Sequence, residues 1–353
     1  MLIATARDFL RRHHPPETAQ RLALDEHGFD AALWGRMAEL GWPGLLVPGE
    51  LGGSDGSQLD VTLLMEEMGR AGLAGPFVTS AVVSTSLLLA ADGSGPRDRM
   101  LASLASGERI ATLALTEESG ASTPDHLAMR CGIPGRLTGT KLLVKDAHVA
   151  TDLLVVLRGG ELLLLPGDRA GIARLPLDTV SGEKLFEVTF DAVEVRAADR
   201  LSAGAAALTH ALTAGALART AEMVGAAQRV LDLAVEYAKT RVQGGRPIGA
   251  YQAIQHACAD LVRDVDTSRG LLYLAAWKLS ESLSAAAEVA TAKAYASEAC
   301  LTVARRGHQI FGAIGYCEEH PLHLLHKRVQ AAGVDYGSAG DHLEIVARSI
   351  GLV

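Results

Sequence analysis

Three histidines near the end of the sequence have a spacing that could hold a metal ion. His320, His323 and His326 recur at every third position beside Lys327 and Arg328, so on a helix they would share one face. Imidazoles are common zinc ligands, but a zinc site needs further ligands, and the sequence supplies none at a suitable spacing. We therefore predict a polar helix face near a cofactor or a subunit interface, and no metal site.

Two adjacent glutamates could act as paired carboxylates in general acid–base catalysis. Glu66 and Glu67 lie in a helical pattern together with Leu63, Leu64 and Met68. We prefer the interpretation that the two side chains lie on a solvated helix face or between helices.

The composition excludes several classes of protein. The 353 residues include 33 lysines and arginines and 41 aspartates and glutamates, which gives a formal net charge of −8. This balance argues against nucleic acid or an anionic membrane as the main partner. A hydrophobic content of 48% and a charged content of 21% exclude disorder over most of the length.

The sequence predicts a cytoplasmic protein. Its first residues show no signal-peptide pattern, and the longest apolar run, Leu271 to Trp277, is far too short to cross a bilayer. The cysteines at positions 131, 258, 300 and 317 form no C-x-x-C pair. Their spacing argues against a zinc site or a disulfide scaffold and for a reducing compartment.

Hydrophobic periodicity divides the chain into three parts and predicts an α+β fold. Residues 1–108 have helical spacing, residues 109–201 alternate strand-length apolar runs with Gly, Pro and Asp, and residues 202–353 are rich in Ala with few helix breakers. These ranges predict an N-terminal helical domain, a middle β domain and a C-terminal helical bundle.

Five segments together resemble the acyl-CoA dehydrogenase family, in order and in spacing, over nearly the whole chain. They are WGRMAELGWPGLLVPGELGG from Trp34, LALTEESGAS from Leu113, VTFDAVEV from Val188, YAKTRVQGGRPIGAYQAIQHACAD from Tyr237 and QIFGAIGYCEEH from Gln309. The resemblance implies the same three-part architecture, with a β-barrel-like middle domain and a C-terminal four-helix bundle. It also implies FAD as the cofactor.

The resemblance assigns a set of cofactor-binding residues. In related enzymes, an arginine and a glutamine of the C-terminal bundle serve an FAD that is bound mainly by the neighbouring chain, and a β segment contacts the flavin ring and its phosphates. The matching positions are Leu113, Leu115, Thr116, Ser122, Arg241, Gln243, Gln309, Gly312 and Ala313.

The chain departs from the family pattern at several positions. Gly244 stands where relatives have a phenylalanine, and Ala313 stands where they have a glycine. Leu143 and Lys145 occupy positions where an aromatic residue and a threonine often flank the flavin. This form resembles the shorter subfamily found in sterol breakdown and secondary metabolism.

The catalytic base is the largest departure from the family pattern. Relatives carry a glutamate in a Y-E-G-T segment, and Tyr336 occupies that slot in this chain. Asp335 is the nearest carboxylate, and it could act as the base if its loop were displaced by one residue. A turn aspartate in a Gly-rich loop is the alternative interpretation.

The resemblance implies α,β-dehydrogenation of an acyl thioester, carried by CoA or by a carrier protein. An electron-transfer flavoprotein or another acceptor would take the electrons, and the assembly would be a homodimer or homotetramer. Two alternatives stay open. The chain could be a non-catalytic subunit of a heterotetramer whose homologous subunit supplies the base, or it could be a flavin-dependent oxidase or monooxygenase on the same scaffold.

Overall fold

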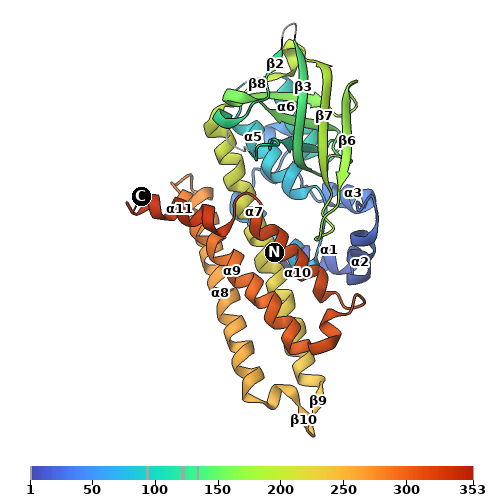
Figure 1. Ribbon diagram of the computed structural model, residues 1–353, viewed down its shortest axis with the longest axis vertical. Helices are drawn as coiled ribbons and strands as arrows, with labels where there is room; N and C mark the ends of the chain where they lie inside the picture. Colours follow the sequence, from blue (N-terminus) through green and yellow to red (C-terminus); the bar gives the residue numbers. More distant parts are fainter. Residues whose placement is uncertain (1, 93–94, 121–123, 133–134, 353) are drawn as a thin grey trace. The chain divides into compact units, whose positions relative to one another are not determined.

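The computed structural model describes residues 2–92, 95–120, 124–132 and 135–352, and the chain divides into two compact units. The helical unit contains residues up to Ala23, Gln58–Leu73 and the chain from Ala216 onward. The mixed unit contains Leu24–Ser57 and Ala74–Gly215. Figure 1 labels the helices and strands of both units.

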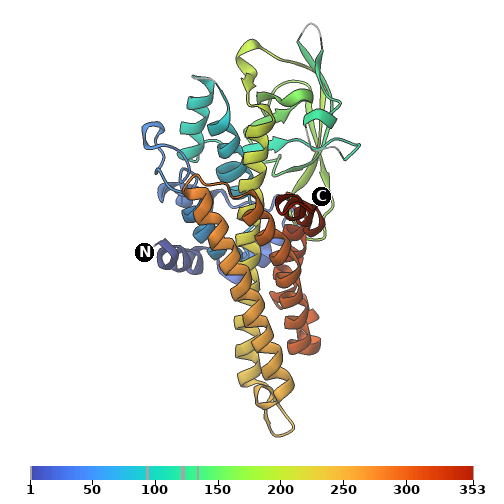
Figure 2. The same cartoon turned by 90° about the vertical axis from the view of Figure 1, so that its left-hand side faces the viewer.

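Long helices form the helical unit, and α9 packs against three others, α8, α10 and α11 (Figures 1 and 2). Alanines and β-branched residues on their inner faces, such as Val230, Ala292 and Val303, are fully buried. The helices are α1 (Leu2–His13), α2 (Pro16–Leu24), α4 (Gln58–Ala71), α7 (Gly204–Thr240), which continues from the mixed unit, α8 (Gln252–Ser280), α9 (Ala286–Phe311), α10 (Leu322–Val334) and α11 (Ala339–Ser349).

A pair of glycines allows α4 and α7 to cross at very short range. A Cβ atom on Gly225 would lie 1.9 Å from the carbonyl oxygen of Glu66, and one on Gly69 would lie 2.1 Å from that of Glu222. Both obstacles are backbone atoms, which cannot move aside as the end of a side chain can. The absence of a side chain at these two positions therefore sets the distance between the helices.

Two four-stranded sheets form the core of the mixed unit. One has the order β1-β4-β5-β8, with β1 parallel to β4, and the other has the order β2-β3-β7-β6 and is antiparallel throughout. The strands are β1 (Ala111–Ala114), β2 (Cys131–Gly132), β3 (Arg136–Lys145), β4 (Asp152–Val156), β5 (Glu161–Pro166), β6 (Ile172–Leu177), β7 (Leu185–Glu194) and β8 (Arg200–Ser202).

The two sheets share one apolar core. Leu153 and Leu163 from the first sheet and Leu137, Val188 and Phe190 from the second belong to the same buried cluster, and each is fully buried. The prediction of an α+β fold is thus confirmed, but its β-barrel-like description needs correction. The strands form two separate open sheets, because the alternating apolar residues of each sheet are buried against the other sheet instead of around a closed ring.

Helices that precede the strands complete the mixed unit. Among them, α3 ends just before Gly41, which has a φ of +73° and follows the last turn. They are α3 (Ala31–Glu39), the π-helical segment η2 (Phe77–Ser84), α5 (Thr85–Ala90) and α6 (Pro96–Ala105). The N-terminal helices therefore divide between the two units, and the three-domain division at residues 108 and 201 stays a prediction.

Within the described ranges, no helix is both long enough and apolar enough to cross a membrane.

Gly225→Ala should destabilise the helical unit by about 1–3 kcal/mol, because the added methyl group forces α4 and α7 apart. The matched control is Gly270→Ala in α8, where an added Cβ meets nothing within 4 Å. Alanine there should stabilise the helix by about 0.5–1 kcal/mol. Thermal unfolding of both variants measures the difference, and an equal Tm for the two would contradict the close helix crossing.

Candidate functional site

The first group of predicted cofactor residues lies on the edge strand β1 and the turn that follows it. Leu113 pairs with Leu154 of β4, and β1 is the last strand of its sheet. The carbonyl group of Leu115 accepts a hydrogen bond from Lys141 at 3.0 Å, and that of Thr116 accepts one from the Leu142 amide at 2.8 Å. Ser122 lies outside the described residues. Hydrogen bonds from β3 to these two carbonyl groups thus hold the turn after β1 in place.

A buried ion pair that the sequence analysis missed holds this turn. The Lys141 ammonium is fully buried and lies 2.8 Å from Oε1 of Glu117, within the LALTEESGAS segment. The same carboxylate accepts hydrogen bonds from the amides of Ala128 and Met129 at 2.6 and 3.1 Å. Burial alone would raise the pKa of Glu117, but the hydrogen bond from Lys141 and those from the two amides outweigh burial and hold the pKa below its ordinary value. Lys141 stands at an inward-facing position of its strand, and a lysine there could have predicted a buried partner of opposite charge.

The two departures from the family pattern on β3 have different surroundings. Lys145 pairs with Glu183 at 3.3 Å, whereas the Leu143 side chain is exposed. Leu143 also has a φ of +55°, at a point where the register with β7 is interrupted between Lys141 and Val144. A leucine in this left-handed conformation is strained, and such strain persists only where the surrounding structure enforces it.

The second group of predicted cofactor residues gathers at one end of the helical unit. Arg241 and Gln243 follow α7, and Gln309, Gly312 and Ala313 lie at the end of α9 or just after it. The rings of Tyr237 and Phe311 stack there with their centroids 4.6 Å apart. Tertiary packing therefore joins two motifs that are far apart in the sequence.

A tight hairpin, β9 (Val242–Gln243) with β10 (Arg246–Pro247), explains why glycine replaces the family phenylalanine. Gly244 and Gly245 have φ values of +59° and +80°, the combination of a two-residue type I′ turn. A Cβ atom on Gly244 would also lie 2.5 Å from the Tyr251 hydroxyl group, which donates a hydrogen bond to the Gln243 carbonyl at 2.9 Å. A phenylalanine at position 244 is incompatible with this turn.

The exposed groups at this end suit the polar parts of FAD. Arg241, Gln243 and Gln309 are exposed, and the Arg241 guanidinium forms no ion pair with any residue in the described ranges. A free guanidinium can donate two parallel hydrogen bonds to phosphate oxygens, and a glutamine amide can pair with hydroxyl or ring nitrogen groups. The donor set therefore fits the cofactor that the family implies.

The predicted base, Asp335, lies in a buried ion cluster instead of an open site. It follows α10 and accepts a hydrogen bond from the guanidinium of Arg219, which is 4% exposed. Arg219 also pairs with Glu222 at 2.5 Å, and Glu222 accepts a further bond from Arg328. An Asp335 oxygen would have to leave its guanidinium before it could accept a substrate proton.

The backbone before Asp335 is fixed by a second buried cation. Lys293 on α9 is fully buried and donates hydrogen bonds to the carbonyl groups of Ala332 and Gly333, each at 2.8 Å. Burial lowers the pKa of Lys293 to about 8. Lys293 thus satisfies the last carbonyl groups of α10 and anchors the segment that continues into Asp335 and Tyr336.

The remaining candidate groups have structural contacts. Glu66 accepts hydrogen bonds from Arg269 at 2.9 Å and Tyr273 at 2.6 Å, and Glu67 pairs with Arg7, which confirms the inter-helix interpretation. His320 packs on Phe311, with ring centroids 4.6 Å apart. The part of the chain that the structure describes contains no cluster of three residues able to hold a metal ion.

Glu117→Gln should destabilise the protein by about 3 kcal/mol, because it leaves the buried Lys141 ammonium without its counter-charge. It should also weaken FAD retention, since the carbonyl side of the β1 turn loses its anchor. The control is Glu118→Gln, a change at the exposed neighbouring residue. Chemical denaturation and the ratio of flavin to protein after gel filtration measure the two effects, and a Glu117→Gln variant as stable as the control would refute the assignment.

Comparisons with known proteins identify the family. The N-terminal domain model of the acyl-CoA dehydrogenases matches residues 1–108, and the C-terminal domain model matches residues 202–351. Acyl-CoA dehydrogenase IpdE2 of Mycobacterium tuberculosis is 30% identical over 94% of this chain and 91% of its own length. Acyl-CoA dehydrogenase FadE27 of the same organism is 30% identical over 95% of this chain and 92% of its own length.

A solved structure agrees with this assignment. The ChsE4–ChsE5 complex of Mycobacterium tuberculosis contains a chain that superposes with a TM-score of 0.91 at 28% identity, over 100% of this chain and 96% of that one. The family resemblance, the domain matches and the fold therefore agree. The chain belongs to the acyl-CoA dehydrogenase family and is an FAD-dependent oxidoreductase.

Proposed function

We propose that this chain takes part in α,β-dehydrogenation of an acyl thioester within an oligomer, and that a homologous subunit supplies the catalytic base. The proposal that another subunit supplies the base rests on the ion pair between Asp335 and the buried Arg219. The neighbouring slot, where relatives have glutamate, holds Tyr336. No carboxylate free of a guanidinium therefore stands at the family's base position in this chain.

The reaction needs two groups that act together on the substrate. Bound FAD would supply the acceptor for the hydride that leaves the β-carbon of the thioester. A carboxylate must remove the α-proton, and its placement within hydrogen-bond reach of that carbon is the protein's contribution. The chain itself supplies the rigid β1 edge for the cofactor and the exposed Arg241 and Gln309.

An oligomer accounts for the exposed position of the cofactor donors. Arg241 and Gln309 lie on the surface of the helical unit, where an FAD held mainly by another chain could reach them. The ChsE4–ChsE5 neighbour is itself a complex of two different chains, which supports a hetero-oligomer over a homodimer or homotetramer. An electron-transfer flavoprotein or another acceptor would reoxidise the flavin, and a cytoplasmic location fits the four unpaired cysteines.

A second candidate keeps the base within this chain. Asp335 would release Arg219 when substrate enters, and Arg219 would remain paired with Glu222 at 2.5 Å. The Asp335 side chain is 17% exposed, so it is within reach of a small rearrangement of its loop. The positive φ values of Tyr336 and Gly337 show that the backbone turns sharply immediately after this residue.

Arg241→Ala should weaken FAD retention by about 1.5–3 kcal/mol, the range for a charge-assisted hydrogen bond. The control is Arg246→Ala on the same hairpin, because the Arg246 guanidinium stacks over the Tyr251 ring at 4.1 Å. FAD affinity measured by flavin fluorescence during cofactor titration tests the difference. Normal affinity in Arg241→Ala would remove this residue from the cofactor site.

Anaerobic flavin bleaching by a panel of acyl-CoA thioesters separates the two candidates for the base. If a partner supplies the base, the chain alone should not bleach, and bleaching should appear when a homologous subunit is co-expressed with it. If Asp335 is the base, the chain alone should bleach and Asp335→Asn should slow the reaction about 10²–10⁴-fold. Bleaching that is equal in the wild type and Asp335→Asn would exclude Asp335.

A further inference from the structure

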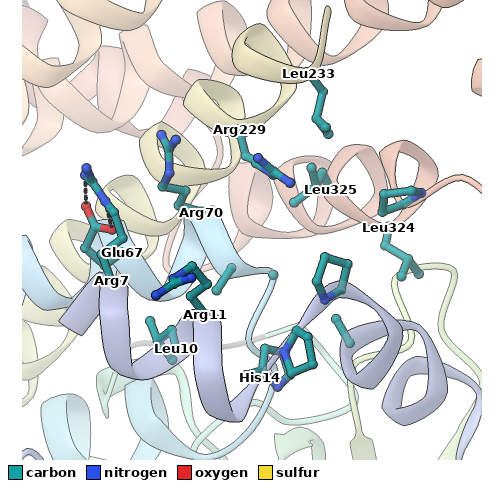
Figure 3. A pocket seen from close by; sticks show the side chains of 16 residues that line it. Arg7, Leu10, Arg11, His14, Glu67, Arg70, Arg229, Leu233, Leu324 and Leu325 are labelled. Atoms are coloured by element: carbon teal, nitrogen blue, oxygen red, sulfur yellow. Dashed lines mark hydrogen bonds and ion pairs between the residues drawn. The ribbon is translucent and has the colours of Figure 1, made fainter. Parts of the chain in front are cut away.

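A cavity of about 300 Å³ lies in the helical unit, among residues of α1, α2, α4, α7 and α10 and the segments beside them (Figure 3). None of the residues assigned above to FAD, and not Asp335, lines this cavity. Much of its wall is apolar, with contributions from Leu10, Ala19, Ala71, Leu233, Leu324 and Leu325. Its volume is at the lower end of the range for small-molecule sites.

Arginines line the same cavity, and three of the four have carboxylate partners. The ion pairs are Arg7 with Glu67 at 2.6 Å, Arg11 with Asp8 at 2.9 Å, and Arg70 with Asp232. These three cations are therefore neutralised within the helical unit.

Arg229 is the exception. It is half-buried on α7, and its guanidinium forms no hydrogen bond or ion pair with any residue in the ranges that the structure describes. Figure 3 shows its side chain extending from α7 toward Leu325 on α10, at the wall of the cavity. Burial, and next the nearby Arg70, lower the pKa of Arg229, and the charge of Asp232 only partly opposes them.

We propose that this cavity binds a small aliphatic monocarboxylate, with its carboxylate on Arg229 and its hydrocarbon body against the leucines. A guanidinium matches a carboxylate by two parallel hydrogen bonds, which would satisfy the uncompensated charge. Inorganic phosphate would leave the apolar wall in contact with water, and a neutral hydrocarbon would leave Arg229 unpaired. A zwitterion would bring an ammonium group toward four arginines.

This ligand differs from the substrate of the proposed function. A simple acyl-CoA has its acyl carbonyl in a thioester, so it lacks the free carboxylate that Arg229 requires. The cavity is therefore a second site, and its existence does not depend on the base or on the oligomeric partner.

Titration calorimetry with sodium octanoate on the full-length, FAD-loaded protein tests the proposal, with octan-1-ol as the uncharged control ligand. Three variants accompany the wild type. Arg229→Gln removes the charge, Ala71→Leu fills the apolar part of the cavity, and Arg12→Gln changes an exposed arginine of α1 that does not line it. Circular dichroism melts establish that each variant is folded. Flavin absorbance recorded in parallel reports any binding beside the flavin.

We expect about one octanoate per chain in the wild type and in Arg12→Gln, with no change in the flavin spectrum. Arg229→Gln and Ala71→Leu should each weaken binding about tenfold or more, and octan-1-ol should bind far more weakly than octanoate. Absence of saturable binding by the wild type would overturn the proposal, as would equal affinity in Arg229→Gln. Binding that shifts the flavin spectrum and survives Arg229→Gln belongs to the substrate site and would overturn it as well.

Discussion

Glu222 on α7 is the buried charge around which the end of the helical unit is organised. It is 2% exposed and pairs with two arginines, Arg219 on its own helix and Arg328 on α10. Two guanidiniums in one buried place need more than one carboxylate, and Asp335 supplies the second. Loss of any member would leave an uncompensated charge away from water, so the cluster holds α10 and the segment after it against α7. The position of Asp335 therefore follows from the charge balance of this cluster.

A similar principle applies to the mixed unit, where Lys141 and Glu117 hold the turn after β1. The pair is buried and has further hydrogen bonds to backbone groups, which is the condition under which a buried ion pair is well satisfied. It fixes the segment to which the family resemblance assigns contacts with the flavin. The main-chain edge that we propose for the cofactor is thus held in place by buried charge.

The arginines of this chain illustrate two uses of one side chain. Arg219, Arg328 and Arg269 are paired with carboxylates and connect helices within the helical unit. Arg241 and Arg229 have no such partner in the described ranges, and each faces either the surface or a cavity. An unpaired guanidinium that is held in place by a rigid helix or hairpin is available for an anion from outside the chain.

Local sequence patterns were sufficient for the family, the order of helices and strands, and the inter-helix role of Glu66 and Glu67. They succeed because helical and strand periodicity, turn glycines and short motifs are properties of neighbouring residues. The hairpin at Gly244 and Gly245 was not predicted, because glycine permits positive φ angles but does not require them.

Tertiary structure alone decided the rest. Arg219 and Asp335 are 116 positions apart, and Lys141 and Glu117 are 24 apart, so no local pattern pairs them. The two open sheets in place of a barrel, and the lone charge of Arg229 among paired arginines, likewise depend on which distant surfaces meet. Burial and ion pairing are set by contacts across the fold, and for that reason the sequence indicated which residues could do chemistry but not which of them remain free to do it.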